Sequence, residues 1–333
     1  MSFVAPAATR RDPIVVGLVN NMPDAALRTT EWQVRDLLAR AAGKAAVSLR
    51  VFSLPEVPRS EAGQQHVGRF HEPIAALWKS GVAGLIVTGT EPKAPCLENE
   101  PYWPALARLV DWAEDHTVST IWSCLASHAA AWRLDGIARE KLDAKMFGVF
   151  ACERVADHKL VDGPARRLVP HSRHNGMPEE ALVRAGYRIL LRSAEAGVDV
   201  FIKQRNSLFV FLQGHPEYDA TALFGEYRRD VRRFLAGEAE RYPELPRGYF
   251  TEAATRALLA FRERALARRD AALLEEFPAE AVGRELTAPW ADAAARFYAN
   301  WLDYLRHARR SGAEAAGAAQ AAMPAPGTDA AVA

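Results

Sequence analysis

Cysteine is scarce in this sequence: three occur among 333 residues, and no two of them form a Cys-x-x-Cys pair. An odd, widely spaced set argues against a disulfide framework and for a reducing compartment. The first six residues lack the basic segment and the long apolar core of a signal peptide. No uninterrupted apolar run is long enough to span a bilayer. These absences predict a cytoplasmic protein without a membrane-spanning segment.

An excess of charge of one sign is also missing. Lys and Arg number 42 against 41 Asp and Glu, which gives a formal net charge of +1. No global field attracts nucleic acid or an anionic membrane, so neither is expected as a partner. The phosphate-binding loops of ATP and NAD enzymes are absent as well. With 49% hydrophobic and 25% charged residues, the composition is that of an ordinary globular protein.

Strands and helices alternate through the first 135 residues. Apolar runs predict strands at residues 14–20, 47–52, 84–89 and 118–121, the last leading into Cys124. Helical patterns fill the intervals at residues 25–42, 74–80 and 102–116. This alternation indicates βαβ units with right-handed crossovers and a parallel sheet. The polar segment 55–73 has no clear period, and we predict a long loop there.

The pattern changes after residue 136. Short apolar runs predict strands of an antiparallel or mixed part at residues 147–152, 188–191, 199–204 and 208–213, the last two forming a hairpin around residues 205–207. Helices are expected at residues 220–235, 252–276 and 290–308. The chain thus divides into an N-terminal arm (1–12), one α/β domain (13–310) and a tail (311–333). The tail is mostly Ala, Gly and Pro, a composition that predicts disorder.

One cysteine stands where a predicted strand meets a predicted helix. Cys124 follows the run that begins at residue 118, and a helical pattern covers residues 127–134. Such a turn exposes a side chain at the edge of an α/β sheet, beside the positive end of a helix, which favours a thiolate. The alternative is a small buried core cysteine, because free cysteine is among the most buried residue types.

A histidine and a glutamate follow another predicted strand. Pro216 pushes His215 toward an extended conformation, and residues i and i+2 of an extended chain share one side. A cysteine nucleophile needs a base, and the base needs an acceptor that fixes its tautomer. Cys124, His215 and Glu217 would supply these three roles. Taken singly, His215 could be a structural histidine and Glu217 a carboxylate that stabilises the following helix.

Several polar segments come directly after predicted strands. Ligands of parallel α/β sheets bind outside the carboxyl ends of the strands. Residues 21–23, residues 88–90 and Cys124 all occupy such positions, so we expect them to lie close together. His171 and His174 are spaced as a metal-binding pair, but a third ligand at a suitable spacing is missing, so no metal is expected.

Short strings distributed over residues 15–305 indicate a family when they are taken together. They are Asn-Met-Pro (21–23), Leu-Ile-Val-Thr-Gly (85–89), Tyr-Trp-Pro (102–104), Ser-Thr (119–120), Gly-Ile (136–137), Lys145 with Gly-Val (148–149), Pro-His-Ser-Arg (170–173), Gly-His-Pro-Glu-Tyr-Asp (214–219), Arg-Asp (229–230) and Asn-Trp-Leu (300–302). In this combination the chain resembles the homoserine O-acyltransferases of methionine biosynthesis. The resemblance implies a flavodoxin-like, class I glutamine-amidotransferase-like α/β fold. That fold has a mostly parallel sheet with flanking helices, plus added antiparallel strands and C-terminal helices.

The resemblance implies a ping-pong acyl transfer from an acyl-CoA to the hydroxyl of homoserine. Cys124 would carry the acyl group, His215 would deprotonate homoserine, and Glu217 would orient His215. No bound cofactor is implied, because acyl-CoA is a co-substrate, and a homodimer is expected. A glutamine amidotransferase-like hydrolase is an alternative, although the Gly-x-Cys-x-Gly motif of those enzymes is missing around Cys124. A non-catalytic binding module is a further alternative.

The resemblance also assigns residues around the nucleophile. Backbone N–H groups near Gly89, Thr90 and Leu125 would form an oxyanion hole. The implied substrate contacts are Lys145, Ser172 and Arg229. A guanidinium such as that of Arg229 can bind the carboxylate of homoserine through two hydrogen bonds.

The acyl donor is the least determined part of the prediction. In the family a glycine typically accompanies succinyl transfer, and a glutamate accompanies acetyl transfer, at the position that Lys93 occupies here. A cationic Lys93 could pair with a succinyl carboxylate, so succinyl-CoA is the expected donor. Acetyl-CoA as donor and serine as acceptor stay open, because an exposed lysine is often simply solvated.

Overall fold

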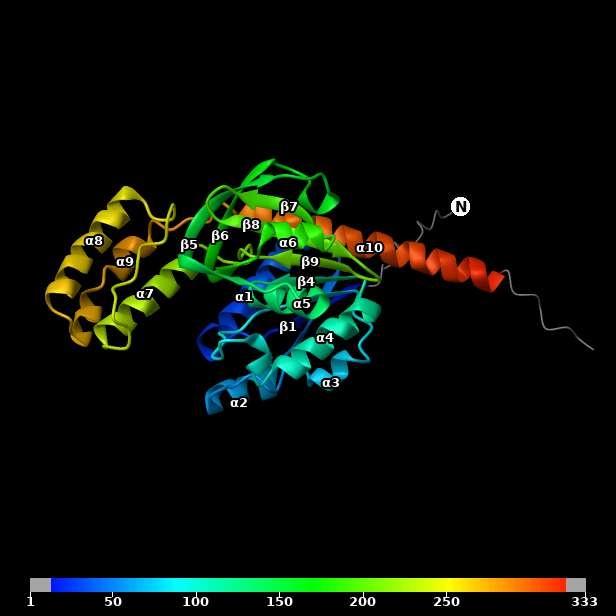
Figure 1. Cartoon of the computed structure of the whole chain (residues 1–333), viewed down its shortest axis with the longest axis horizontal. Helices are drawn as coiled ribbons and strands as arrows, with labels where there is room; N and C mark the ends of the chain where they lie inside the picture. The colour runs from blue at the N-terminus through cyan, green and yellow to red at the C-terminus, as the bar shows by residue number, and fades with distance from the viewer. Residues whose placement is uncertain (1–12, 322–333) are drawn as a thin grey trace, which may run out of the picture.

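A nine-stranded sheet forms the centre of the protein (Figure 1). The computed structural model describes residues 13–321 along the backbone and the side chains as far as residue 308. The predicted arm at residues 1–12 and residues 322–333 of the predicted tail lie outside this range. The strand order is β2-β1-β3-β4-β9-β8-β7-β5-β6. The strands are β1 (Ile14–Val19), β2 (Val47–Phe52), β3 (Gly84–Val87), β4 (Ser119–Ser123), β5 (Glu140–Arg154), β6 (Arg166–Gly176), β7 (Arg188–Ser193), β8 (Gly197–Gln204) and β9 (Leu208–Leu212).

The first half of the sheet is parallel, as predicted from the alternation of strands and helices. β1 pairs with β2 and β3, β3 pairs with β4, and β4 pairs with β9, all in parallel. Parallel strands are covered on both faces, which explains their nearly continuous apolar runs. The segments after these strands meet as expected. The N–H of Asn21 donates to the hydroxyl of Thr88 at 2.8 Å, and Gly89 lies so close to Leu125, which follows Cys124, that a Cβ on it would be 2.6 Å from the Cβ of Leu125.

The second half of the sheet is antiparallel. The predicted hairpin is present as β8 and β9, which pair antiparallel, and β5, β6 and β7 extend the sheet beyond it. The sequence did not indicate β6 as a strand, because residues 166–176 mix Arg, His and Ser and contain Pro170. β6 is the outer strand of the sheet, where a proline is tolerated.

Helices cover both faces of the sheet (Figure 1). The main ones are α1 (Asp24–Ala42), α4 (Trp103–His116), α5 (Leu125–Asp135), α7 (Ala222–Leu235), α8 (Glu252–Ala267) and α10 (Ala291–Ala321). The shorter ones are α2 (Glu61–Phe70), α3 (Ile74–Leu77), α6 (Glu179–Arg184) and α9 (Ala279–Gly283). α1 and α10 pack on one face through buried side chains such as Leu37 and Trp301, and α4 and α5 pack on the other.

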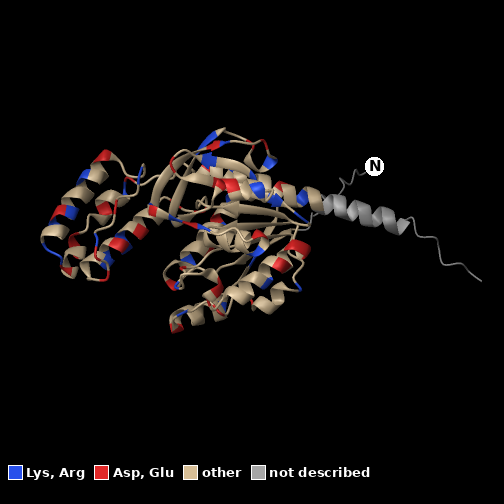
Figure 2. Ribbon diagram, viewed as in Figure 1, with Lys and Arg blue, Asp and Glu red and all other residues tan. Residues whose placement is uncertain are grey.

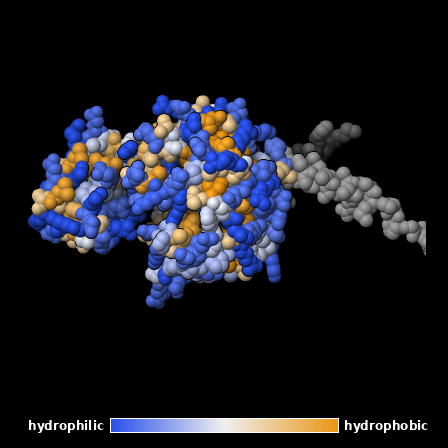
Figure 3. Space-filling model, in the orientation of Figure 1, coloured by the Kyte–Doolittle hydropathy of each residue, from blue (hydrophilic) through white to orange (hydrophobic). Residues whose placement is uncertain are grey.

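A helical unit made of α7, α8 and α9 projects from the antiparallel end of the sheet (Figure 1). It has its own cluster of buried side chains, which includes Tyr227, Phe261 and Phe277. In the view of Figure 2, acidic and basic residues are interspersed on this unit, and Figure 3 shows apolar side chains among them. The exposed Leu266 of α8 is one such apolar residue.

The prediction of one helix over residues 252–276 is wrong. α8 ends at Ala267, Arg268 is extended with φ −139°, and the short 3-10 helix η3 (Ala271–Glu276) follows. Asp270 causes the break, because its carboxylate accepts a hydrogen bond from the N–H of Ala272 and caps the new turn.

The prediction of a loop over residues 55–73 is also wrong, because this segment contains α2. Ser60 begins the helix by accepting a hydrogen bond from the N–H of Gly63. Only Gly63 and His66 of α2 are buried, so the helix lacks the apolar stripe by which helices are recognised.

The last helix is longer than expected. α10 continues to Ala321, past residue 310, where we placed the end of the domain. Among residues 13–321, no helix combines the length and apolar character that crossing a membrane requires.

Candidate active site

Cys124 occupies a strained turn between β4 and α5. Its φ of 51° is positive, which no other non-glycine residue shows among those described, and its ψ is −113°. Such a conformation costs on the order of 1–3 kcal/mol and persists only where the surroundings hold it. Here the carbonyl of Cys124 accepts hydrogen bonds from the N–H of Ser127 at 3.0 Å and from its hydroxyl at 2.7 Å. The thiol is therefore presented by a fixed backbone at the N-terminus of α5.

His215 and Glu217 come together beyond the end of β9. Nδ1 of His215 lies 2.8 Å from a carboxylate oxygen of Glu217, and both side chains are largely buried. The N–H of His215 donates to the carbonyl of Pro170 at 2.8 Å, which fixes the backbone of the histidine. The two side chains meet as expected, but the backbone between them is a turn and not the extended chain that we expected: the N–H of Tyr218 donates to the carbonyl of His215 at 3.1 Å and closes it.

The imidazole of His215 also interacts with the thiol of Cys124. Burial by itself lowers the pKa of His215, but the charges of Glu217 and Cys124, with hydrogen bonds to both residues, raise it well above its usual value. The chain therefore brings the thiol of Cys124, the imidazole of His215 and the carboxylate of Glu217 together, and these neighbours favour the imidazolium form of His215.

The expected oxyanion donors lie beside Cys124. Leu125 is the first residue of α5, so its N–H has no carbonyl partner within the helix. Gly89 packs directly on it: a Cβ added to Gly89 would lie 2.6 Å from the Cβ of Leu125 and 3.0 Å from its nitrogen. Gly89, two residues after the end of β3, thus lies against the backbone of the first residue of α5, which directly follows Cys124.

The three expected substrate contacts also gather in one place, around Glu226 of α7. The hydroxyl of Ser172 donates to Glu226 at 2.5 Å, and Nζ of Lys145 lies 3.5 Å from the same carboxylate. Arg229 lies 3.7 Å from Glu226 and donates to Asp230 at 2.9 Å. Strands β5 and β6 and helix α7 therefore build a cluster of two cations, two carboxylates and a hydroxyl.

Tyr218 contacts both this cluster and His215. Its ring stacks on that of His215 with centroids 4.4 Å apart and an interplanar angle of 14°. Its hydroxyl donates to Glu226 at 2.7 Å. We did not assign roles to Glu226 or Tyr218 from the sequence. The available signals were the place of Tyr218 directly after Glu217 and the spacing of Glu226 three residues before Arg229.

A row of buried, hydrogen-bonded side chains holds the backbone of Cys124. Nε2 of Gln213 donates to the hydroxyl of Ser127 at 2.5 Å, and Oε1 of Gln213 lies 2.9 Å from Nε2 of His128. Ser127 in turn holds the carbonyl of Cys124. Burial lowers the pKa of His128 to about 4, so this histidine is neutral near pH 7. Gln213 comes two residues before His215, so this row connects the nucleophile with the segment that carries the base.

A second buried network lies beneath His215. One oxygen of Asp199 accepts the N–H of Gly214 at 3.0 Å and lies 3.5 Å from Nε2 of His171. Burial raises the pKa of Asp199 to about 6, although hydrogen bonds and nearby arginines oppose the shift. His174 is exposed, so it does not join His171 as a second ligand.

The loop after β3 faces the charged cluster. Burial lowers the pKa of Arg229, but its carboxylate neighbours, with Glu91 among them, raise it overall, so Glu91 lies within electrostatic range. The side chain of Lys93 is exposed, while its N–H donates to the buried carboxylate of Glu100 at 2.5 Å. The backbone of this loop is thus anchored, and the amino group of Lys93 extends to solvent.

Comparison with known proteins identifies the family. A sequence model described as homoserine O-succinyltransferase matches residues 4–311. Homoserine O-succinyltransferase of Methylorubrum extorquens is 49% identical over 288 residues, which cover 86% of each chain. The protein of the same name from Bradyrhizobium japonicum is 48% identical over 299 residues, covering 89% of this chain and 91% of that protein. The one from Rhodopseudomonas palustris is 50% identical over 291 residues, covering 87% of each chain.

Among solved structures, a glutamine amidotransferase from Methylobacillus flagellatus has a similar fold. Its TM-score is 0.50 at 15% sequence identity, and the match covers 88% of this chain and 94% of that one. This likeness confirms the predicted class I glutamine-amidotransferase-like fold. The sequence match, which spans nearly the whole chain, goes further than the fold: the chain belongs to the homoserine O-succinyltransferase family and is an acyltransferase.

Proposed function

We propose that the protein transfers the succinyl group of succinyl-CoA to the hydroxyl of L-homoserine through an acyl-Cys124 intermediate. The observation that carries the proposal is the contact of Cys124 with the His215–Glu217 pair, at the strained turn of a chain from this family. The names of the relatives at 48–50% identity support the same reaction.

In the first half-reaction, the thiolate of Cys124 attacks the thioester carbonyl of succinyl-CoA. The carbonyl oxygen becomes an oxyanion, and the N–H groups of Leu125 and Thr90 would stabilise it. When the intermediate collapses, the bond to the CoA sulfur breaks and the imidazolium of His215 gives its proton to the departing thiolate. The products are free CoA and a succinyl thioester on Cys124, with His215 neutral.

In the second half-reaction, neutral His215 takes the proton of the homoserine hydroxyl. The oxygen attacks the thioester on Cys124, and the carbon–sulfur bond breaks to release O-succinylhomoserine. The thiolate and the imidazolium are both restored. Glu217 supports the step by accepting the hydrogen on Nδ1 of His215, which keeps Nε2 directed at the reacting atoms.

The charged cluster around Glu226 suits an amino-acid acceptor. Homoserine carries one ammonium and one carboxylate at neutral pH. Arg229 can bind the carboxylate through two hydrogen bonds, and Glu226 can accept from the ammonium. Lys145 and Ser172 already contact Glu226, so they would hold the carboxylate of Glu226 in place.

The product fits a place in methionine biosynthesis, as the family resemblance implies, and we expect the enzyme to work in the cytoplasm as a homodimer. The three cysteines are free, in keeping with a reducing compartment.

A donor and acceptor panel tests the proposal. Succinyl-CoA and acetyl-CoA are each combined with homoserine or serine, and mass spectrometry reads the mass added to Cys124 and to the amino acid. We expect a succinyl adduct on Cys124 without acceptor and O-succinylhomoserine with homoserine. Exclusive acetyl transfer would contradict the donor, and glutamine hydrolysis without CoA release would contradict the reaction class.

The Lys93→Ala variant refines the donor assignment. If the amino group of Lys93 pairs with the succinyl carboxylate, KM for succinyl-CoA should rise severalfold while any use of acetyl-CoA is unchanged. Equal KM values in the two proteins would show that the exposed Lys93 has no part in donor choice.

A further inference from the structure

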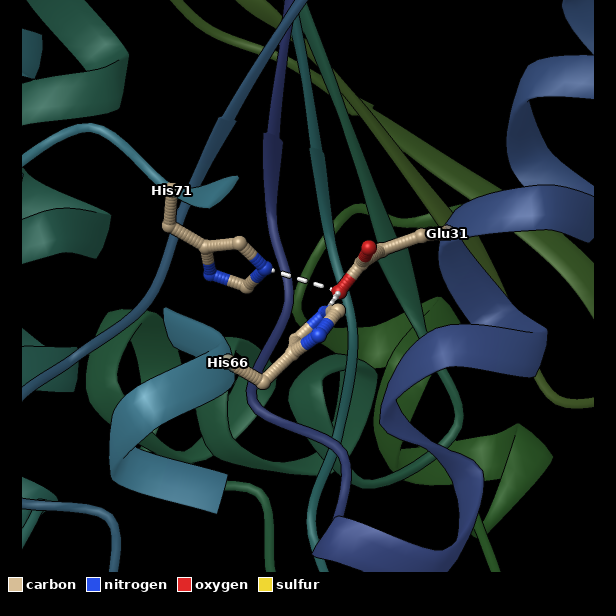
Figure 4. A group of neighbouring side chains, drawn as sticks. All are labelled: Glu31, His66 and His71. Carbon is tan, nitrogen blue, oxygen red and sulfur yellow. Dashed lines mark hydrogen bonds and ion pairs between the residues drawn. The ribbon is translucent and has the colours of Figure 1, made fainter. Parts of the chain in front are cut away.

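A second group of ionisable side chains lies at the β2 edge of the sheet. It is placed between α1, α2 and the start of α3. Figure 4 shows Glu31 of α1 facing His66 of α2 and His71, which follows α2. Nε2 of His66 and Nε2 of His71 each lie 2.8 Å from the same oxygen of Glu31. These ligand atoms all lie within 4.8 Å of one another.

The group is buried but not sealed. The side chains of His66 and His71 are 7% and 1% exposed, whereas that of Glu31 is 16% exposed. Both histidines therefore meet Glu31 at the side of the group that is open to solvent. Arg59, which interacts electrostatically with Glu31, forms an ion pair with Asp24.

The ring protons of the two histidines face Glu31 on Nε2, and no donor among the described residues binds Nδ1 and so keeps them there. Nδ1 of His66 and Nδ1 of His71 are both buried and have no hydrogen-bond partner. A protein donor at Nδ1 would oblige Nε2 to carry the proton and would prevent it from binding a cation. Without such a donor, each ring can shift its proton to Nδ1 and offer the lone pair of Nε2 toward Glu31.

The attachment of α2 depends on this group. The buried residues of α2 are Gly63 and His66, so no apolar side chain of the helix is buried. Gly63 packs against the carboxylate of Asp24, and His66 contacts Glu31. Helices are normally held by an apolar face, whereas α2 is held to α1 by polar groups at two points.

We propose that Glu31, His66 and His71 bind a divalent transition-metal ion of the zinc class, which fastens α2 to α1. Two imidazoles and one carboxylate are a common ligand set for zinc, with water completing the coordination. With bonds of about 2.0–2.2 Å, tetrahedral ligand atoms lie about 3.3 Å apart. Opening the present 2.8 Å contacts by about half an ångström needs only small side-chain rotations.

A second trio of this kind, Cys152, His171 and Asp199, is less suitable. All three are fully buried, which leaves a cation no entry path. Asp199 already accepts the N–H of Gly214, and the charges of Arg173 and Arg167 act on it. Two guanidinium groups beside the trio would repel a dication, whereas Arg59 near Glu31 is neutralised by Asp24.

Metal titration of the untagged protein tests the proposal. The Cys124→Ala background removes the catalytic thiol as a competing ligand. The protein is stripped with a chelator and titrated with Zn²⁺ by calorimetry, and with Co²⁺ by visible absorption. We expect about one equivalent of tight binding, a cobalt spectrum of nitrogen and oxygen ligands at low coordination number, and a higher Tm with Zn²⁺.

Two variants locate the ion. Glu31→Gln keeps the size of the side chain and its capacity to accept hydrogen bonds, and His71→Gln removes one imidazole. Each should weaken Zn²⁺ binding by more than about tenfold, since even supporting contacts of metal sites are worth 10–100-fold. If one variant fails to fold by circular dichroism, the other supplies the comparison.

His116→Gln is the matched control, because His116 is exposed on α4 and its Nδ1 contacts the carbonyl of Trp112. Its affinity for Zn²⁺ should equal that of the parent. Absence of Zn²⁺ binding in the parent would overturn the proposal, as would equal binding in the parent and the folded Glu31 or His71 variant.

Discussion

The two halves of the sheet contribute to the active site in different ways. The parallel half provides backbone: the strained turn at Cys124, the free N–H of Leu125 and the close approach of Gly89. The antiparallel half, with α7, provides charged side chains gathered around Glu226. His215 stands between them, because β9 pairs parallel with β4 and antiparallel with β8.

Under the proposed mechanism, the parallel half would carry the chemical steps and the antiparallel half would recognise the acceptor. Acyl transfer between thiol and thioester needs a nucleophile and oxyanion donors in fixed positions, which a rigid backbone supplies. Recognition of an amino-acid acceptor needs charges of both signs, which flexible side chains supply. Changes in the parallel half should therefore affect both half-reactions, and changes in the cluster should affect only the second.

The largest expected effect comes from removing the nucleophile. Cys124→Ala should lower homoserine-dependent CoA release at least about a thousandfold, as in other nucleophile–base systems, while the fold is retained. A thiol assay measures release, and circular dichroism checks the fold. Cys96→Ala removes an exposed thiol elsewhere and should keep full activity. Turnover in Cys124→Ala near that of the parent would refute the nucleophile.

Asp199→Asn tests the support of the base on the antiparallel side. Since burial raises the pKa of Asp199 from 3.8 to about 6, the folded chain keeps a proton that the unfolded chain loses. The parent should therefore lose stability as pH rises from about 3, below both pKa values, to about 7, above both, by about 3 kcal/mol from this group. Urea unfolding at the two pH values should show that loss reduced in the variant. Identical pH dependence in both proteins would show that Asp199 titrates normally.

Gly89→Ala tests the close approach of Gly89 to Leu125 on the parallel side. The new Cβ would lie 2.6 Å from that of Leu125 and must displace the first residue of α5. We expect kcat to fall about a hundredfold, the loss typical of a misplaced oxyanion donor, with slower acylation of Cys124. Gly68→Ala is the control, because nothing lies within 4 Å of a Cβ there. Unchanged acylation in Gly89→Ala would remove this contact from the mechanism.

Glu226→Gln should have the smallest effect, and it addresses the comparison most directly. Loss of the charge should raise KM for homoserine about tenfold, because a charged hydrogen bond to the ammonium is worth about 1.5–3 kcal/mol. Acylation of Cys124 by succinyl-CoA, followed by mass spectrometry, should be unchanged. The exposed Glu238 of the same region gives the control variant Glu238→Gln. Slower acylation in Glu226→Gln would mean that the two halves of the site are not separable.

The sequence predicted the parts of the site that have local causes. Cys124 lies at a junction of strand and helix, and Pro216 sets the backbone between His215 and Glu217. These signals lie within a few residues of the side chains concerned. Lys145, Ser172 and Arg229 were expected as substrate contacts only from the family resemblance, since each residue alone looks like a solvated or turn residue; in the structure each of them contacts Glu226.

The parts that the sequence did not predict arise from tertiary packing. Glu226 lies among arginines on α7, and this sequence pattern is typical of an exposed helix face. In the structure, side chains of β5 and β6 contact Glu226. Asp199 is buried because β8 pairs with β9, which places it beneath Gly214. α2 was missed because its buried residues are Gly63, which has no side chain, and His66, which is polar.

The stacking of Tyr218 on His215 has a consequence for the lifetime of the acyl-enzyme. An acceptor whose ammonium binds Glu226 would share that carboxylate with the hydroxyl of Tyr218, the ring of which stacks on the imidazole of His215. Tyr218 thus connects the expected binding site of the amino acid with His215, the proposed base. Water lacks an ammonium group that Glu226 could bind. We therefore expect the thioester on Cys124 to be hydrolysed slowly and to persist until homoserine binds.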